Sequence, residues 1–155
     1  MLENVVPGRY RIRTLDSPPN AYLESILVGE QDVLTNDVEL SDISPPVRLL
    51  YRRDPGTVRG TVENGPGATV VLIPQEKLLL GDNFTRIATC DSTGRFEVTG
   101  LRPGDYYAFA FRRELFWNEF SNPAFFTSLI PSAVPVQVRR GEASSANLRV
   151  TTWPE

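Results

Sequence analysis

Short stretches in which apolar and polar residues alternate recur along the chain, and turn-forming residues separate them. The clearest example runs from Thr89 to Phe111. Within it, Arg95–Val98 and Asp105–Phe111 have the two-residue period of half-buried strands. The turn at Asp91–Gly94 precedes the first of these strands, and the turn at Pro103-Gly104 precedes the second, with glycine at the position that needs a positive φ. This alternation of turns and short strands predicts an all-β fold.

The same pattern predicts seven strands after residue 56, which fit an antiparallel Greek-key β-sandwich of the prealbumin or Ig-like type. We expect these strands at Thr57–Glu63, Ala68–Ile73, Phe84–Cys90, Arg95–Val98, Asp105–Phe111, Val134–Val138 and Asn147–Thr151. Two longer connections remain, Pro74–Asn83 and Arg113–Ala133. The second contains Ser121-Asn122-Pro123, which is typical of a helix cap followed by proline at the first helical position. One short helix is therefore expected near residues 122–130.

A repeated motif indicates a second unit of the same kind. The pattern Pro-Gly-x-Tyr occurs at Pro7–Tyr10 and again at Pro103–Tyr106, about one sandwich-domain length apart. Each tyrosine is expected to be the first inward residue of the strand that follows the turn. Residues 1–53 are interpreted as the second half of a truncated sandwich unit, residues 54–56 as a linker and residues 57–155 as a complete domain. The strands expected in the first part are Arg9–Leu15, Tyr22–Val28, Val33–Leu40 and Val47–Arg52.

Composition and charge narrow the classes of partner. The 155 residues include 13 prolines and 11 glycines, which fits many turns between short strands. The formal charge is −3, with 16 basic and 19 acidic residues intermixed, so the chain has no basic stripe for a nucleic acid. Its apolar runs are much shorter than the ~20 residues of a membrane helix. We therefore expect no nucleic-acid partner and no membrane span in this chain.

The residues that usually carry catalysis are scarce. The chain has no histidine, which removes the usual general base and the commonest metal ligand. Its one cysteine, Cys90, is expected to be packed at a strand end rather than reactive. A carboxylate pair such as Glu114 and Glu119 has no spacing that singles it out for glycoside chemistry. We therefore predict no catalytic residues, no metal and no cofactor.

Five short motifs occur in a fixed order between residues 57 and 152, and together they resemble the carboxypeptidase regulatory-like domains. They are Gly60-Thr61-Val62, Gly67-Ala68-Thr69-Val70, Asp91-x-x-Gly94-x-Phe96, Leu101-x-Pro103-Gly104-x-Tyr106 and Gly141-Glu142. The resemblance implies a transthyretin-like, carbohydrate-binding-like sandwich without an active site. It also implies tandem modules in large exported or cell-envelope proteins, and so an extracellular or envelope location. Asn64-Gly65-Pro66 is shorter than the usual hairpin of the family, which is expected to alter one loop.

The turn residues of this region are interpreted as structural. Asp91 and Gly94 are expected to form an Asx-type turn, in which the aspartate side chain accepts backbone N–H bonds. Pro103 and Gly104 are expected to form the next turn. Tyr106 then matches a tyrosine corner, a buried tyrosine whose hydroxyl bonds back to nearby backbone.

A row of aromatic residues on the reverse side of the same strand is the best candidate binding site. Tyr107, Phe109 and Phe111 share one face if Tyr106 points to the core. One interpretation is that the following connection folds over this row as a second core. The alternative is an open platform on which sugar rings or a protein could stack. The residues of that connection expected at such a site are Trp117, Asn118 and Glu119.

These observations favour a non-catalytic accessory module of a larger exported or envelope protein. The first hypothesis is a spacer or protein-interaction domain, with other domains of the parent protein or envelope proteins as partners. The alternative is a carbohydrate-binding module that holds a polysaccharide on an aromatic platform around Trp117. An enzyme is the least favoured hypothesis, because the chain has no histidine and no pair of cysteines.

Overall fold

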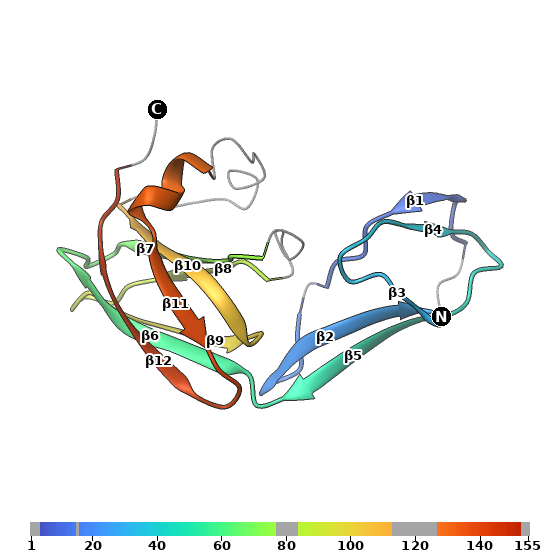
Figure 1. Ribbon diagram of the computed structural model, residues 1–155, viewed down its shortest axis with the longest axis horizontal. Helices are drawn as coiled ribbons and strands as arrows, with labels where there is room; N and C mark the ends of the chain where they lie inside the picture. Colours follow the sequence, from blue (N-terminus) through green and yellow to red (C-terminus); the bar gives the residue numbers. More distant parts are fainter. Residues whose placement is uncertain (1–3, 15, 77–83, 113–126, 153–155) are drawn as a thin grey trace. The chain divides into compact units, whose positions relative to one another are not determined.

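The structure is a computed structural model that describes residues 4–14, 16–76, 84–112 and 127–152 (Figure 1). The chain divides into two compact units, Met1–Asp54 and Pro55–Glu155, here called unit 1 and unit 2. Strands form most of the regular structure of both units. The expected all-β fold class is therefore confirmed.

Unit 1 contains two small antiparallel sheets, one of β1 and β4 and one in the order β3-β2-β5. Its strands are β1 (Gly8–Tyr10), β2 (Ala21–Val28), β3 (Gln31–Asp32), β4 (Val38–Leu40) and β5 (Val47–Arg53). The second and last of these match the expected strands closely. The single strand expected at Val33–Leu40 is wrong in its first half. The Asp32 carboxylate accepts the backbone N–H of Leu34 at 3.0 Å, and the chain turns there before β4 begins.

Unit 2 contains the seven strands expected of the sandwich, arranged in two sheets (Figure 1). They are β6 (Gly56–Glu63), β7 (Thr69–Pro74), β8 (Arg86–Thr89), β9 (Arg95–Leu101), β10 (Gly104–Phe111), β11 (Val134–Val138) and β12 (Ala143–Arg149). One sheet has the order β11-β10-β7-β8 and the other the order β12-β6-β9. The main core lies between the sheets, because its buried side chains come from strands of both.

One strand pair departs from the antiparallel arrangement that the sequence predicts. β12 runs parallel to β6, with Ala146 in register with Gly60, whereas the other strand pairs of the described residues are antiparallel. A Cβ atom built on Gly60 would overlap the backbone carbonyl of Ala146. The glycine of the Gly60-Thr61-Val62 motif is therefore needed for the close approach of these two strands.

A short helical segment lies in the connection between β10 and β11. Residues 127–129 are helical and continue into the 3₁₀ turn η3 (Ile130–Ser132). A helix is expected near residues 122–130, and residues 127–130 of that range agree with it. Residues 122–126 lie outside the described residues. Across the described residues, no helix is both long enough and apolar enough to cross a membrane.

The close contact at Gly60 leads to a stability prediction. Gly60→Ala should lower the free energy of unfolding of unit 2 by about 3 kcal/mol, because the added methyl group must displace the backbone of β12. Gly67→Ala is the matched control, since its added Cβ meets no atom within 4 Å. Its only cost is the strain of an alanine at a φ of 74°. That control should cost about 1 kcal/mol. Urea unfolding followed by circular dichroism measures both, and equal losses would contradict the steric explanation.

Candidate functional site

The tyrosine after the second Pro-Gly turn is part of the scaffold of unit 2. Tyr106 is only 2% exposed, and its hydroxyl donates a hydrogen bond of 2.7 Å to the carbonyl of Arg102. Burial raises the pKa of this hydroxyl to about 12, although the charges of Arg86 and Arg102 act in the opposite direction. The predicted tyrosine corner is confirmed. Tyr106 therefore holds the turn at Pro103-Gly104 against the strand that follows it.

The equivalent tyrosine of unit 1 forms the same bond in a different environment. The Tyr10 hydroxyl donates to the carbonyl of Val6 at 2.5 Å, again four residues back in the chain. Its side chain is nevertheless 37% exposed, so the prediction that Tyr10 points inward is wrong. The reason is that β1 is a three-residue strand that pairs only with β4 in the described residues, whereas β10 is hydrogen-bonded to a strand on each side.

The loop before β9 is held by one carboxylate. Asp91 Oδ1 accepts hydrogen bonds from the Thr93 backbone at 2.8 Å, the Thr93 hydroxyl at 2.6 Å and the Arg95 backbone at 3.0 Å. These bonds lower the pKa of Asp91, and the bond from the Thr93 hydroxyl has the largest effect. Gly94 completes the turn with a φ of 77°. The predicted Asx-type turn is confirmed, and Asp91 has a structural role in it.

The cysteine beside this turn is also a packing residue. Cys90 is 5% exposed and belongs to the core between the two sheets. Burial raises the pKa of its thiol, and the nearby charge of Asp91 adds to the effect. A raised pKa leaves little thiolate at neutral pH, so this side chain is a poor nucleophile. In the part of the chain that the structure describes, no group of three or more histidine, cysteine, aspartate or glutamate side chains could hold a metal.

The aromatic row on the reverse side of β10 is largely covered. Phe109 is 1% exposed and Phe111 is fully buried, and their rings stack with centroids 6.1 Å apart and an interplanar angle of 16°. They form a second cluster with Val71, Ile73 and Leu129. Leu129 belongs to the connection that follows β10. In the described residues this is the arrangement that the second-core interpretation requires, whereas an open platform requires exposed rings.

The remaining residues of that candidate site are not brought together by the described structure. Tyr107 is half-buried against the second cluster. Trp117, Asn118 and Glu119 lie outside the described residues. A binding role for these four side chains stays a prediction.

The exposed side of the sheet β12-β6-β9 forms a second candidate surface, which we call the outer polar face. Its exposed side chains include Arg59, Thr61, Glu63, Arg95, Glu97, Ser145, Asn147 and Arg149. Strand register places them in cross-strand rows, of which Ser145, Arg59 and Glu97 form one. The Nε atom of Arg59 lies 3.4 Å from Oε2 of Glu97. The outer polar face is thus a ladder of neighbouring polar pairs.

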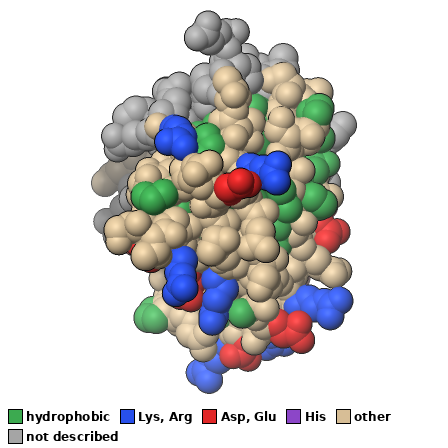
Figure 2. Space-filling view, turned by 90° about the vertical axis from the view of Figure 1, so that its left-hand side faces the viewer, with side chains coloured by type: hydrophobic (Ala, Val, Ile, Leu, Met, Phe, Trp, Pro, Cys, Tyr) green, Lys and Arg blue, Asp and Glu red, His purple; other side chains and the backbone are tan. Residues whose placement is uncertain are grey.

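Two further contacts extend this ladder along the strands. The Thr61 hydroxyl donates to Oδ1 of Asn147 at 3.2 Å, and Nε of Arg149 lies 2.9 Å from Oε2 of Glu63. Pairs as exposed as these contribute little to stability, because water and salt screen them. Charged side chains of both signs are also interspersed in the view of Figure 2. The chemistry of the outer polar face therefore suits a polar partner of mixed charge.

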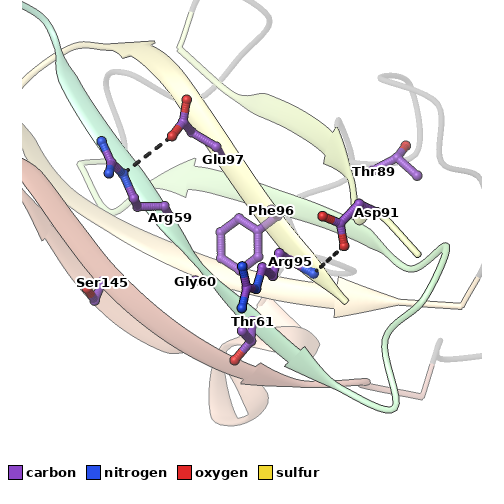
Figure 3. A pocket seen from close by; sticks show the side chains of 9 residues that line it. All are labelled: Arg59, Gly60, Thr61, Thr89, Asp91, Arg95, Phe96, Glu97 and Ser145. Carbon is purple, nitrogen blue, oxygen red and sulfur yellow. Dashed lines mark hydrogen bonds and ion pairs between the residues drawn. The ribbon is translucent and has the colours of Figure 1, made fainter. Parts of the chain in front are cut away.

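A shallow open depression of about 610 Å³ lies on this face beside the Asp91 turn (Figure 3). Strands β6, β9 and β12, the end of β8 and the Asp91 turn supply its lining, which consists of Arg59, Gly60, Thr61, Thr89, Asp91, Arg95, Phe96, Glu97 and Ser145. The Phe96 side chain is 5% exposed and belongs to the core beneath the sheet. The depression therefore presents guanidinium, carboxylate and hydroxyl groups to a ligand.

The outer polar face is not evident from the sequence alone. Its residues alternate with buried ones along each strand, which is the pattern of any half-buried sheet. Their grouping depends on which strands are neighbours and in what register, and the parallel pairing of β12 with β6 was not expected. The alternation alone predicts that these side chains are exposed, but it does not predict that β12, β6 and β9 are neighbours in one sheet.

Comparisons with known proteins show no family. No protein-family model matches the chain, and no curated protein matches it in sequence. Among solved structures, it is similar to the Bacillus anthracis TIE protein, with 15% identity and a TM-score of 0.40 over 94% of this chain and 34% of that one. It is also similar to the group B streptococcus pilus 2b backbone protein, with 16% identity and a TM-score of 0.36 over 89% of this chain and 50% of that one.

The chain thus spans between a third and a half of those two solved proteins. Similarity at this level carries no argument about function. The carboxypeptidase regulatory-like family, expected from five motifs, is not shown by these comparisons.

The two tyrosine corners provide a matched pair of substitutions. Tyr106→Phe should lower the free energy of unfolding of unit 2 by about 1.5 kcal/mol, because the Arg102 carbonyl loses its buried donor. Tyr10→Phe removes the same bond at an exposed position and should cost less than about 0.5 kcal/mol. Urea unfolding of both variants tests the difference. A loss for Tyr106→Phe no larger than that for Tyr10→Phe would contradict the scaffold role of the buried hydroxyl.

Proposed function

We propose that the chain is a non-catalytic accessory module of a larger exported or cell-envelope protein, where it acts as a spacer or protein-interaction domain. We further propose that unit 2 is a carboxypeptidase regulatory-like domain. The order of its five motifs supports this assignment, as does the structural use of the motif residues in a seven-strand sandwich. The proposed location outside the cytoplasm comes from the same resemblance.

The observation that carries the proposal is that the most distinctive side chains of unit 2 maintain the fold. The Asp91 carboxylate is occupied by three bonds within its own turn. The Tyr106 hydroxyl is bonded to Arg102 and buried, and Cys90 is a core residue. Burial keeps Tyr106 and Cys90 away from a substrate, and the Asp91 carboxylate, although exposed at the depression, already bonds within its own turn. What unit 2 does present in the described residues is the outer polar face.

The outer polar face is suited to contact with another domain or protein. Its side chains are exposed, and a partner with charges of both signs can exchange the existing pairs for new ones across an interface. Protein interfaces of the non-obligate kind are about as polar as the rest of the surface. Because its exposed ion pairs contribute little to stability, substitutions here should change binding without unfolding the sandwich.

This role predicts a cross-linking pattern in the full-length parent protein within its native envelope. A photoactivatable residue in place of Thr61, at the centre of the outer polar face, should cross-link to a defined neighbouring domain or protein. The same residue in place of Gln137, which is exposed on β11, is the matched control and should cross-link much less. Mass spectrometry of the cross-linked peptides measures the yield at both positions.

A charge-reversed variant sharpens the same experiment. Arg59→Glu combined with Arg95→Glu should reduce the Thr61 cross-link about tenfold while changing the melting temperature by less than about 3 °C. If Thr61 and Gln137 give equal yields, or if the reversal leaves the cross-link intact, the outer polar face is not the contact surface.

Carbohydrate binding around Trp117 is the second candidate function. The observation in its favour is that Tyr107 remains partly exposed beside the connection that carries Trp117. Sugar rings stack on such aromatic side chains through their apolar C–H faces. The role then depends on Trp117, Asn118 and Glu119 forming an accessible surface next to Tyr107.

Affinity electrophoresis in gels that contain plant, bacterial or algal polysaccharides tests this second function. A carbohydrate-binding module should be retarded by at least one polymer, and Trp117→Ala should restore the mobility seen without polymer. The melting temperature of the variant should stay nearly unchanged if Trp117 is a surface residue. Unchanged mobility of the wild-type chain in every gel would exclude the carbohydrate hypothesis.

A further inference from the structure

The last strand of unit 1 forms an edge of its sheet. β5 pairs with β2 from Val28↔Val47 to Ala21↔Arg53, and the sheet order β3-β2-β5 places no described strand on its other side. All seven residues of β5 are half-buried or exposed, whereas most residues of β2 are buried. An edge strand presents alternate backbone N–H and C=O groups that can pair with an added strand.

One face of this edge strand exposes apolar side chains. Val47 and Leu49 lie opposite Val28 and Ile26 of β2, so these four side chains share a face. Ile26 is fully buried and Val28 is 8% exposed, which marks this as the core face of the sheet. Leu49 is nevertheless 42% exposed. The core of unit 1 therefore covers β2 but leaves part of the apolar surface of β5 open.

The other face of β5 carries positive charge. Arg48 and Arg52 lie there with Leu50, which is 41% exposed. Arg52 forms an ion pair with Glu24, with Nε 2.5 Å from Oε2, and this pairing raises the pKa of the arginine. Arg48 donates to the carbonyl of Gly29 at 3.3 Å, a bond that leaves its charge uncompensated. A carboxylate brought to this face would meet a guanidinium already held along the strand.

This arrangement differs from the usual protection of an edge strand. Proteins often prevent strand addition with charges that point inward, or with proline on the edge. In β5 the inward positions Val47, Leu49 and Tyr51 are apolar, and Arg53 at the end of the strand is the exception. Arg48 and Arg52 are on the opposite face, and the strand contains no proline. From Val47 to Arg52, the edge thus combines backbone groups that no other described strand pairs with, an apolar face and a basic face.

We propose that the edge of β5 binds an extended acidic segment of a partner protein by strand addition. Apolar side chains of the added strand would cover Val47 and Leu49. Its carboxylates would face Arg48 and lie near Arg52, which is already paired with Glu24. A second copy of this chain fits less well, because its own β5 would bring the same arginines to the contact. The proposal is independent of the proposed function of unit 2, because it concerns unit 1.

A designed probe tests the proposal with the full chain. The probe is a capped, fluorescein-labelled peptide of about eight residues that alternates valine and glutamate, which is the length and pattern of an ordinary strand. Fluorescence anisotropy should show saturable binding. A peptide with lysine in place of glutamate should bind at least tenfold more weakly. An acidic peptide methylated on alternate backbone nitrogens should also lose about tenfold, because strand addition needs those N–H groups.

Two protein variants locate the binding. Leu49→Lys places a charge on the inward face of the edge and should weaken binding about tenfold. Ile43→Lys is the matched control, because Ile43 is 94% exposed in unit 1 but lies outside its strands, and it should bind like wild type. Thermal unfolding shows whether each variant is folded. If Leu49→Lys does not fold, the methylated peptide still decides the question with the wild-type chain.

The proposal is overturned by absence of binding, by equal binding of the lysine peptide, or by binding that survives backbone methylation. Sedimentation of the chain without peptide measures whether it forms a dimer. A dimer that Leu49→Lys dissociates would assign this edge to a second copy and would also overturn the proposal.

Discussion

Burial of β10 on both of its faces is the constraint on which unit 2 depends. Tyr106, Ala108 and Ala110 face the core between the sheets, and Phe109 and Phe111 face a second cluster completed by the connection to β11. A strand covered on both sides has little polar surface of its own, so it must be hydrogen-bonded along both edges. The flanking strands β7 and β11 provide those bonds, and the tyrosine corner fixes where the strand begins.

This constraint also decides which parts of unit 2 can act on other molecules. The side chains with the most distinctive chemistry, Asp91, Cys90 and Tyr106, are needed where they are for the sandwich to form. The covered aromatic rings Phe109 and Phe111 are needed for the second core. We propose partner contact at two surfaces that have no such structural role in the described residues, the outer polar face of unit 2 and the basic, partly apolar edge of unit 1.

Local patterns predicted the features that depend on few neighbouring residues. The Asx-type turn at Asp91, the tyrosine corner at Tyr106 and the strand at Val134–Val138 are all set by residues close together in the chain. The features that the sequence missed depend on partners far along it. Parallel pairing of β12 with β6 brings Ala146 to Gly60, and no local pattern distinguishes that pairing from an antiparallel one. Tyr10 has the same motif as Tyr106, but in the described residues its strand β1 is paired on one side only, with β4. A prediction from the motif alone therefore overestimated the burial of Tyr10.

Native-state hydrogen exchange of β10 tests the central claim most directly. If the strand is the doubly buried centre of unit 2, the amides that it donates to β7 and β11 should exchange only through global unfolding of that unit. Their opening free energies should then equal the free energy of unfolding from urea titration. Exchange of the Phe109 and Phe111 amides through low-energy local opening, while the amides of β6 and β9 stay protected, would contradict the account. In that case the aromatic face would be an accessible surface rather than a core.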